Sequence, residues 1–160
     1  MILPELLRFL GMTTLLLLIS VTDCKTRQIP VYGMVELGMT GGGYLIFACL
    51  TEWSAGGRGL TPFFSALFGL LAAALLCLGC RIPGKDSIGG GDIKLLLLLG
   101  FCLGIPAFFR ALFLTAVFSV CVGAGLLLLR KTKKGDTLPF APFLTGGTVL
   151  ALLWQVVETR

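Results

Sequence analysis

Residues 62–80 read PFFSALFGLLAAALLCLGC, a run without a single charged side chain. A helix needs about 20 mostly apolar residues to cross the hydrocarbon core of a bilayer, so this run predicts a membrane-spanning helix. The whole chain of 160 residues is similar in character: 56% of its residues are hydrophobic, 13% are charged, and the mean hydropathy is +0.98. A soluble domain of this size cannot bury so much apolar surface. The composition therefore excludes a soluble enzyme and a disordered chain, and it indicates an integral membrane protein.

The same length criterion finds further spans on both sides of this run. They are expected at about residues 3–22, 31–50, 93–109, 111–129 and 139–157. The fourth and fifth spans meet at Arg110 with almost no loop between them. Because the connections are short, we expect residues 1–160 to form a single domain, an all-α compact bundle of six transmembrane helices.

The basic residues are distributed unevenly between the two sides of the predicted bundle. Nine of the thirteen fall beside the first, third and fifth connections: Lys25, Arg27, Arg81, Lys85, Lys94, Arg130, Lys131, Lys133 and Lys134. The other four fall on the opposite side: Arg8, Arg58, Arg110 and Arg160. Lys and Arg gather in cytoplasmic loops, so the side with nine is expected in the cytoplasm and both termini outside. This asymmetry also explains the net charge of +5 without a nucleic-acid partner, for which no basic, aromatic-rich module is present.

The residue inventory limits the possible chemistry. The chain has no His and six Cys, and five of the cysteines lie in apolar runs, where Cys behaves as a small hydrophobe. Triads of the Ser-His-Asp or Cys-His kind are therefore excluded, and a zinc site lacks ligands. We expect neither a metal nor a cofactor. Acid–base chemistry near neutral pH is left to carboxylates, Lys, Tyr or Cys.

Among the eight acidic residues, the four aspartates all fall on the predicted cytoplasmic side: Asp23, Asp86, Asp92 and Asp136. Asp23 ends the first span and Asp92 begins the fourth, so both lie at the boundary between apolar helix and polar loop. Two carboxyl groups brought together there would share one proton. Such a pair can polarise a water molecule and protonate a leaving amine. Taken one at a time, either residue is as well explained as a solvated acid at a helix end.

Glycines precede the second of these aspartates, in the sequence Gly89-Gly90-Gly91-Asp92. Without Cβ atoms, these residues allow close approach of another backbone and positive φ angles. Asp92 would lie in the first turn of the fourth helix, where the helix dipole favours a carboxylate. The segment is therefore suited to placing a carboxyl group beside an extended peptide, although a flexible turn would have the same composition.

Three motifs resemble those of the type IV prepilin peptidases and their preflagellin-processing relatives. They are D-x-x-x-R-x-I-P at residues 23–30, G-x-G-D-x-K-L at 89–95 and P-F-x-P-F at 139–143. All three occur in order and at predicted helix boundaries, and the likeness covers nearly the whole chain. One departure is Val31, where many members have Asn after the Ile-Pro pair.

The resemblance implies a membrane aspartic endopeptidase of the GxGD type in the cell membrane of a prokaryote. By motif, Asp23 and Asp92 would be the catalytic pair, and Gly89 and Gly91 would shape the segment beside it. The substrate would be a prepilin-like protein with a short basic leader before an apolar helix, cut at the cytoplasmic face. Larger members also methylate the new N-terminus and carry a segment with two C-x-x-C pairs. This chain has no such segment, so we expect peptidase activity alone.

Two further acids are candidates for substrate contact, Glu36 inside the second span and Asp86 in the third connection. An ionisable group within a span is a functional candidate by default. Two other functions remain open from the sequence. One is a small proton-coupled transporter, which would distribute its acids through the depth of the bilayer. The other is a non-enzymatic subunit of a pilus or secretion machine, which would need no paired aspartates.

Overall fold

A computed structural model of the chain describes residues 2–26, 29–57, 59–81, 89–128 and 140–158. Within these ranges the regular structure is helical throughout, and no strand is present. The helices are α1 (Ile2–Thr26), α2 (Val31–Ser54), α3 (Thr61–Arg81), α4 (Gly90–Leu128) and α5 (Phe140–Glu158). Each of the five contains a stretch that is long and apolar enough to cross a membrane. The structure therefore agrees with the predicted all-helical membrane class.

The predicted count of six spans is not confirmed, because two of the predicted spans lie in one helix. The stretches expected at 93–109 and 111–129 both fall in α4, which has 39 residues. A straight helix of that length would measure about 58 Å, nearly twice the ~30 Å of a bilayer core. The backbone of α4 leaves helical geometry at Gly104, where φ is 72° and ψ is 171°. The boundary expected at Arg110 is therefore wrong, and the break comes earlier in the chain.

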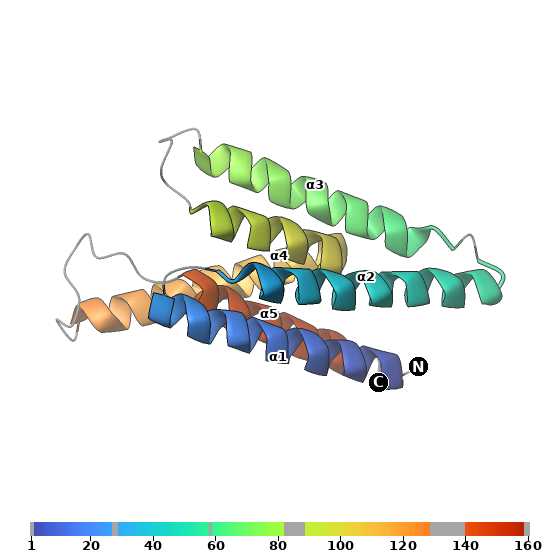
Figure 1. The fold of residues 1–160 in the computed structure, drawn as a ribbon, viewed down its shortest axis with the longest axis horizontal. Coiled ribbons are helices and arrows are strands. Elements are labelled where there is room, and N and C mark those ends of the chain that lie inside the picture. The colour runs from blue at the N-terminus through green and yellow to red at the C-terminus, as the bar shows by residue number, and fades with distance from the viewer. Residues whose placement is uncertain (1, 27–28, 58, 82–88, 129–139, 159–160) are drawn as a thin grey trace.

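The two parts of α4 run in opposite directions on either side of this break. Figure 1 shows the start and the finish of α4 at the same end of the bundle, with the turn between them at the other end. In the second part, Thr115 lies against Gly147 and Phe118 packs on Phe143, so this part is antiparallel to α5. A glycine can adopt the positive φ of the break without strain. Pro106, two residues later, has no backbone N–H to continue the earlier hydrogen-bond pattern.

Small residues lie where the helices approach one another most closely. A Cβ placed on Gly100 of α4 would come within 2.5 Å of the Gly69 carbonyl oxygen of α3. A Cβ on Gly41 of α2 would collide with Cys102 of α4. Contacts of this kind are typical of helix packing in membranes, where backbone proximity replaces the hydrophobic effect between helices. The glycines of α2, α3 and α4 thus set how closely these helices pack.

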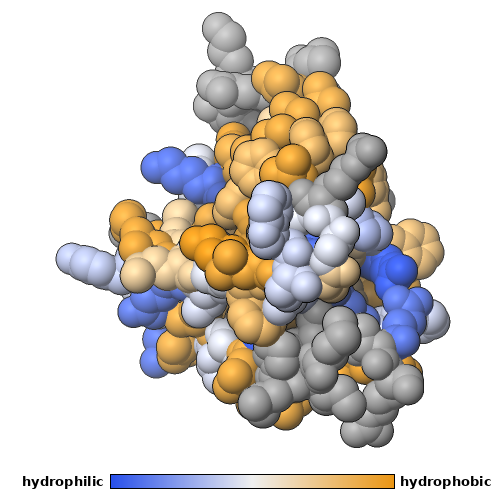
Figure 2. Space-filling model, turned by 90° about the vertical axis from the view of Figure 1, so that its right-hand side faces the viewer, coloured by the Kyte–Doolittle hydropathy of each residue, from blue (hydrophilic) through white to orange (hydrophobic). Residues whose placement is uncertain are grey.

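Apolar side chains divide into a buried core and an exposed outer surface. The largest fully buried side chains are Met12, Leu16, Ile19, Leu37, Leu95, Leu99, Phe108, Leu144 and Thr148. Large hydrophobic side chains also remain exposed on every helix, among them Leu18, Met39, Leu75, Phe113 and Val157. Figure 2 shows one end of the bundle, where hydrophobic side chains (orange) cover much of the described surface and hydrophilic ones (blue) lie in separate groups, mainly toward the edges of the view. An outer surface of this composition fits contact with lipid.

The bundle has two ends with different contents. At the end that we call the Asp end, α1 finishes and α2, α4 and α5 begin, and Asp23 and Asp92 lie there (Figure 1). At the opposite end, called the far end, α1 begins, α5 finishes, and the turn between α2 and α3 lies (Figure 1). The first turn of α1 and the last turn of α5 therefore share one end of the bundle.

Candidate active site

Asp23 lies in the last turn of α1 and is buried, with 7% of its surface exposed. Its Oδ2 atom accepts a hydrogen bond of 3.3 Å from the backbone N–H of Ala141, at the start of α5. The first N–H groups of a helix have no partner within the helix, and the helix dipole places positive charge there. The amino end of α5 therefore both satisfies and stabilises a negative charge on Asp23.

Asp92 lies in the first turn of α4 and is partly buried. Its carboxyl group lies over Gly89, since a Cβ on that glycine would come within 3.2 Å of Oδ2 of Asp92. The N–H of Ile93 donates to the Gly89 carbonyl oxygen at 3.2 Å, which closes the first turn of α4. Gly89 thus leaves the space that the carboxyl group occupies.

Both carboxyl groups lie at the Asp end although 69 positions separate them in the chain. They lie close enough for Asp23 to act electrostatically on Asp92. Their surroundings differ: Asp23 is buried against the amino end of α5, whereas Asp92 is partly open. Two carboxyl groups that lie close together cannot both ionise freely. The role of Asp23 and Asp92 as an acid–base pair stays a prediction.

The other parts of the three motifs also gather at the Asp end. Ile29, just before α2, packs against Gly91, where a Cβ would lie 3.3 Å from Cδ1 of Ile29. The amino end of α5 supplies Ala141, and Phe143, two residues later, is buried against Phe118. Segments from the first, second and third motif therefore form one site.

The other candidate residues from the sequence differ in where they lie and in how exposed they are. Glu36 is exposed in the second turn of α2, and its predicted contact with substrate stays a prediction. Asp86 and Arg27 lie outside the described residues. Lys94 is exposed in the first turn of α4. Gly89 lies against the Asp92 carboxyl group and Gly91 against Ile29, and their predicted role in shaping the segment stays a prediction. Among the residues that the structure describes, no three Cys, Asp or Glu side chains are grouped to hold a metal ion.

The sequence did not predict two polar contacts of the structure, one made by the Ala141 N–H and one by Arg8. The backbone N–H of Ala141 carries no signal in its side chain, although the Pro-Phe-x-Pro-Phe entrance to the last span marks the helix start that exposes it. Arg8 was expected at the outer edge of the first span, yet 7% of its surface is exposed and its guanidinium donates to the Cys102 carbonyl oxygen at 3.0 Å. A charge within an apolar run is the available signal, because such a group is costly in a membrane unless it has a partner.

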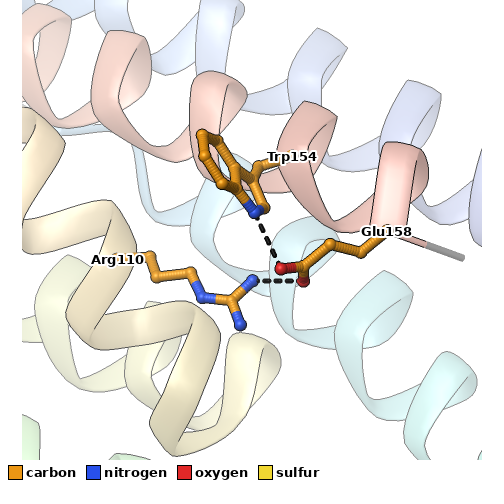
Figure 3. A network of polar contacts seen from close by, with 3 residues as sticks. All are labelled: Arg110, Trp154 and Glu158. Atoms are coloured by element: carbon orange, nitrogen blue, oxygen red, sulfur yellow. Dashed lines mark hydrogen bonds and ion pairs between the residues drawn. The ribbon is translucent and has the colours of Figure 1, made fainter.

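A second polar region lies at the far end, away from the carboxyl pair. Figure 3 shows Arg110 of α4 and Trp154 of α5 both directed at Glu158, with hydrogen bonds of 2.6 Å and 2.8 Å. Arg110 and Glu158 line a cavity of about 420 Å³ that reaches inward to Arg8 and Tyr44. The cavity is not part of the candidate active site, because neither aspartate lines it.

Comparison with known proteins gives an independent result. Residues 10–128 match the family model described as the type IV leader peptidase family. The chain is 32% identical over 144 residues to the prepilin leader peptidase/N-methyltransferase of Bacillus subtilis, which covers 88% of this chain and 53% of that protein. It is 30% identical over 149 residues to the protein of the same name from Pseudomonas aeruginosa, covering 91% and 48%. The chain thus spans about half the length of these relatives. No solved structure matches it.

Proposed function

The chain belongs to the type IV leader peptidase family, and on this basis we propose that it is a membrane aspartic endopeptidase that removes the leader of prepilin-like proteins. The observation that carries the proposal is that Asp23 and Asp92 lie at the same end of the bundle, where Asp23 accepts from the Ala141 N–H and Asp92 lies over Gly89. A peptidase without His needs such a pair, because one carboxylate can take a proton from water while the other gives one to the leaving nitrogen.

The proposed reaction uses one proton shared by two carboxyl groups. The ionised member accepts a proton from a water molecule as that water attacks the scissile carbonyl carbon. The protonated member donates to the nitrogen as the peptide bond breaks, so the pair ends with one proton, as it began. The two roles belong to the pair and not to a fixed residue. Gly89 and Gly91 shape the segment beside the pair, and their missing side chains leave room for an extended peptide.

The proposed substrate has a short basic leader followed by an apolar helix. The apolar helix would enter the bilayer beside the bundle, which places the leader junction at the level of Asp23 and Asp92. We also propose that the Asp end faces the cytoplasm of a prokaryotic cell and that both termini are outside, because Lys and Arg gather on cytoplasmic sides. The exposed Lys25 and Lys94 lie at that end. Glu36 and Asp86 remain proposed contacts for the substrate, and residues 1–160 a proposed single domain.

The two other functions considered from the sequence are less well supported. A proton-coupled transporter would need ionisable groups along a path through the bundle, and a structural subunit would need no carboxyl pair. Membership of a leader peptidase family favours hydrolysis over both. The relatives' printed name also includes an N-methyltransferase activity, and we propose only peptide cleavage for residues 1–160.

The test replaces each aspartate separately, as Asp23→Asn and Asp92→Asn. Each variant is expected to lower the rate of leader cleavage by about 10²- to 10⁴-fold, because Asn can neither accept nor donate the proton. Cleavage is measured by the mass of the product from a prepilin-like substrate in liposomes. The matched control is Glu52→Gln, an acid at the far end, which should cleave at the normal rate. A normal rate in either Asn variant, with the protein folded and inserted, would contradict the proposal.

A further inference from the structure

The break in α4 leaves backbone carbonyl groups without helical partners. The first part of α4 ends at Gly104, whose φ of 72° and ψ of 171° interrupt the helix. The last carbonyl groups of a helix have no intrahelical donor, and Pro106 has no N–H to offer the Cys102 carbonyl, four residues earlier. Inside a bilayer, such a group needs a donor from elsewhere in the protein.

Arg8 of α1 supplies that donor. Its guanidinium donates to the Cys102 carbonyl oxygen at 3.0 Å and lies 4.2 Å from the centre of the Tyr44 ring of α2. A cation at the carboxyl end of a helix is also favoured by the helix dipole. One buried side chain thus joins α1, α2 and the first part of α4 at a single point.

The surroundings of this contact explain why a hydrogen bond is needed there. Arg8, Tyr44, Cys102, Gly104 and Pro106 all line the cavity of about 420 Å³ at the far end. On that side, the end of the first part of α4 faces open space and not close-packed apolar side chains. Between this point and the Asp end, Leu16 and Ile19 of α1 and Leu95 and Leu99 of α4 belong to one apolar core, to which α2 and α5 also contribute. Apolar packing is non-directional, whereas a hydrogen bond restricts both distance and angle.

Two of the three helices joined by Arg8, α1 and α4, carry the aspartates. Asp23 follows Arg8 by fifteen residues on α1, about 22 Å along the helix axis, and Asp92 precedes Cys102 by ten residues on α4, about 15 Å. We propose that Arg8 is a positioning residue, which fixes how far α1 is displaced along its axis relative to α4 and thereby the separation of Asp23 from Asp92. The inference rests on the proposed function, because it concerns the geometry of the proposed acid–base pair.

The test compares Arg8→Gln, Arg8→Lys and the control Arg110→Gln. Arg110 also lines the cavity and also carries a positive charge, but it is exposed and its ion pair joins α4 to α5, not to α1. In Arg8→Gln, kcat for leader cleavage is expected to fall by about ten- to a hundredfold while KM stays close to the wild-type value. Arg8→Lys keeps a hydrogen-bond donor, so its kcat should lie between that of Arg8→Gln and that of the wild type. Arg110→Gln should resemble the wild type.

Two further measurements separate positioning from a merely structural role. The bell-shaped dependence of kcat on pH should narrow in Arg8→Gln, because carboxyl groups that lie further apart couple more weakly. Spin labels on Cys24, at the exposed end of α1, and on Lys94→Cys, at the exposed start of α4, report the geometry without any reaction. For this measurement Cys49, Cys80 and Cys121 are replaced by alanine. The label-to-label distance should shift or broaden in Arg8→Gln and not in Arg110→Gln.

The outcomes test the positioning role of Arg8 and the proposed peptidase function separately. If kcat per folded molecule, the pH profile and the label distances are all unchanged in Arg8→Gln, the positioning role is overturned. If kcat falls only in proportion to the folded fraction, with unchanged label distances, the role is overturned as well. If the wild-type protein does not cleave a prepilin-like substrate, the proposed function fails. The label distances then still show whether Arg8 sets the spacing of α1 and α4.

Discussion

At the scale of single residues, the site depends on one backbone group as much as on its side chains. The N–H of Ala141 donates to Asp23, and hydrogen bonds to a charged group contribute about 1.5–3 kcal/mol. Asp23 therefore owes its environment to the place where α5 begins. A residue whose side chain is only a methyl group becomes part of the site through its position in the first turn of a helix.

Replacing Ala141 by proline tests this contact. Proline fits the first turn of a helix but has no N–H, so Ala141→Pro removes the donor to Asp23 while α5 can still form. We expect the cleavage rate to fall by about ten- to a hundredfold, the equivalent of one hydrogen bond to a charged group. Ala141→Gly keeps the N–H and serves as the control. Equal rates in the two variants, measured on folded protein, would show that the hydrogen bond does not matter to cleavage.

The dependence of cleavage on pH provides a second prediction at this scale. A pair that shares one proton is active only when one carboxyl group is ionised and the other protonated. The rate should therefore fall at low pH, where both are protonated, and at high pH, where both are ionised, giving a bell-shaped profile of kcat/KM. The measurement is the initial rate across pH in liposomes. A profile with a single limb would mean that the two carboxyl groups do not act as a pair.

At the scale of the helices, the sequence predicted the positions of the spans more reliably than their junctions. The runs at 31–50, 62–80 and 139–157 fall within α2, α3 and α5 almost as expected, because length and hydropathy alone determine whether a helix can cross a bilayer. The junction between the next two spans was placed at Arg110, since a charge was taken as the sign of a boundary. The chain turns instead at Gly104, where a positive φ is required, and a glycine among many in an apolar run gives no such signal.

Glycine contacts between helices give a prediction at this scale. Gly69→Ala places a Cβ against the Gly100 backbone, and overpacking of this kind costs about 1–3 kcal/mol. Gly79→Ala on the same helix is the matched control, because a Cβ there meets nothing within 4 Å. Thermal unfolding in detergent should show a lower midpoint for Gly69→Ala and no decrease for Gly79→Ala. If the two midpoints were the same, the close approach of α3 and α4 would not limit stability.

At the scale of the whole molecule, the sequence predicted which residues meet but not how they are held. Their places at span boundaries predict Asp23 and Asp92 on one face, and both lie at the Asp end. Arg8 is predicted in the outer group of basic residues, and the structure places it toward the far end and buried within the bundle. Its partner is a carbonyl group that exists as an acceptor only because α4 is broken, and no property of the Arg8 neighbourhood in the sequence indicates that break.

The orientation of the bundle in the membrane is a prediction for the whole molecule. Cys24 is exposed near the Asp end, and Ala55 is exposed in the turn at the far end. With the Asp end in the cytoplasm, a membrane-impermeant thiol reagent added to intact cells should label an Ala55→Cys variant that lacks Cys24. It should label Cys24 only in inverted vesicles. The reverse pattern would place the carboxyl pair outside the cell and would contradict the assignment of cytoplasmic cleavage.

The reversal of α4 at Gly104 also has a consequence for how the protein is made. The two parts of α4 are joined without a polar loop, so little hydrophilic chain has to be carried across the bilayer when they enter it. Unpaired carbonyl groups are costly in lipid. The backbone groups at the turn of such a helical hairpin are shielded from lipid only when both arms are present. We therefore expect the two arms of α4 to leave the ribosome and partition into the membrane together, as one unit of biogenesis, with Arg8 already in place from the earlier α1 to receive the turn.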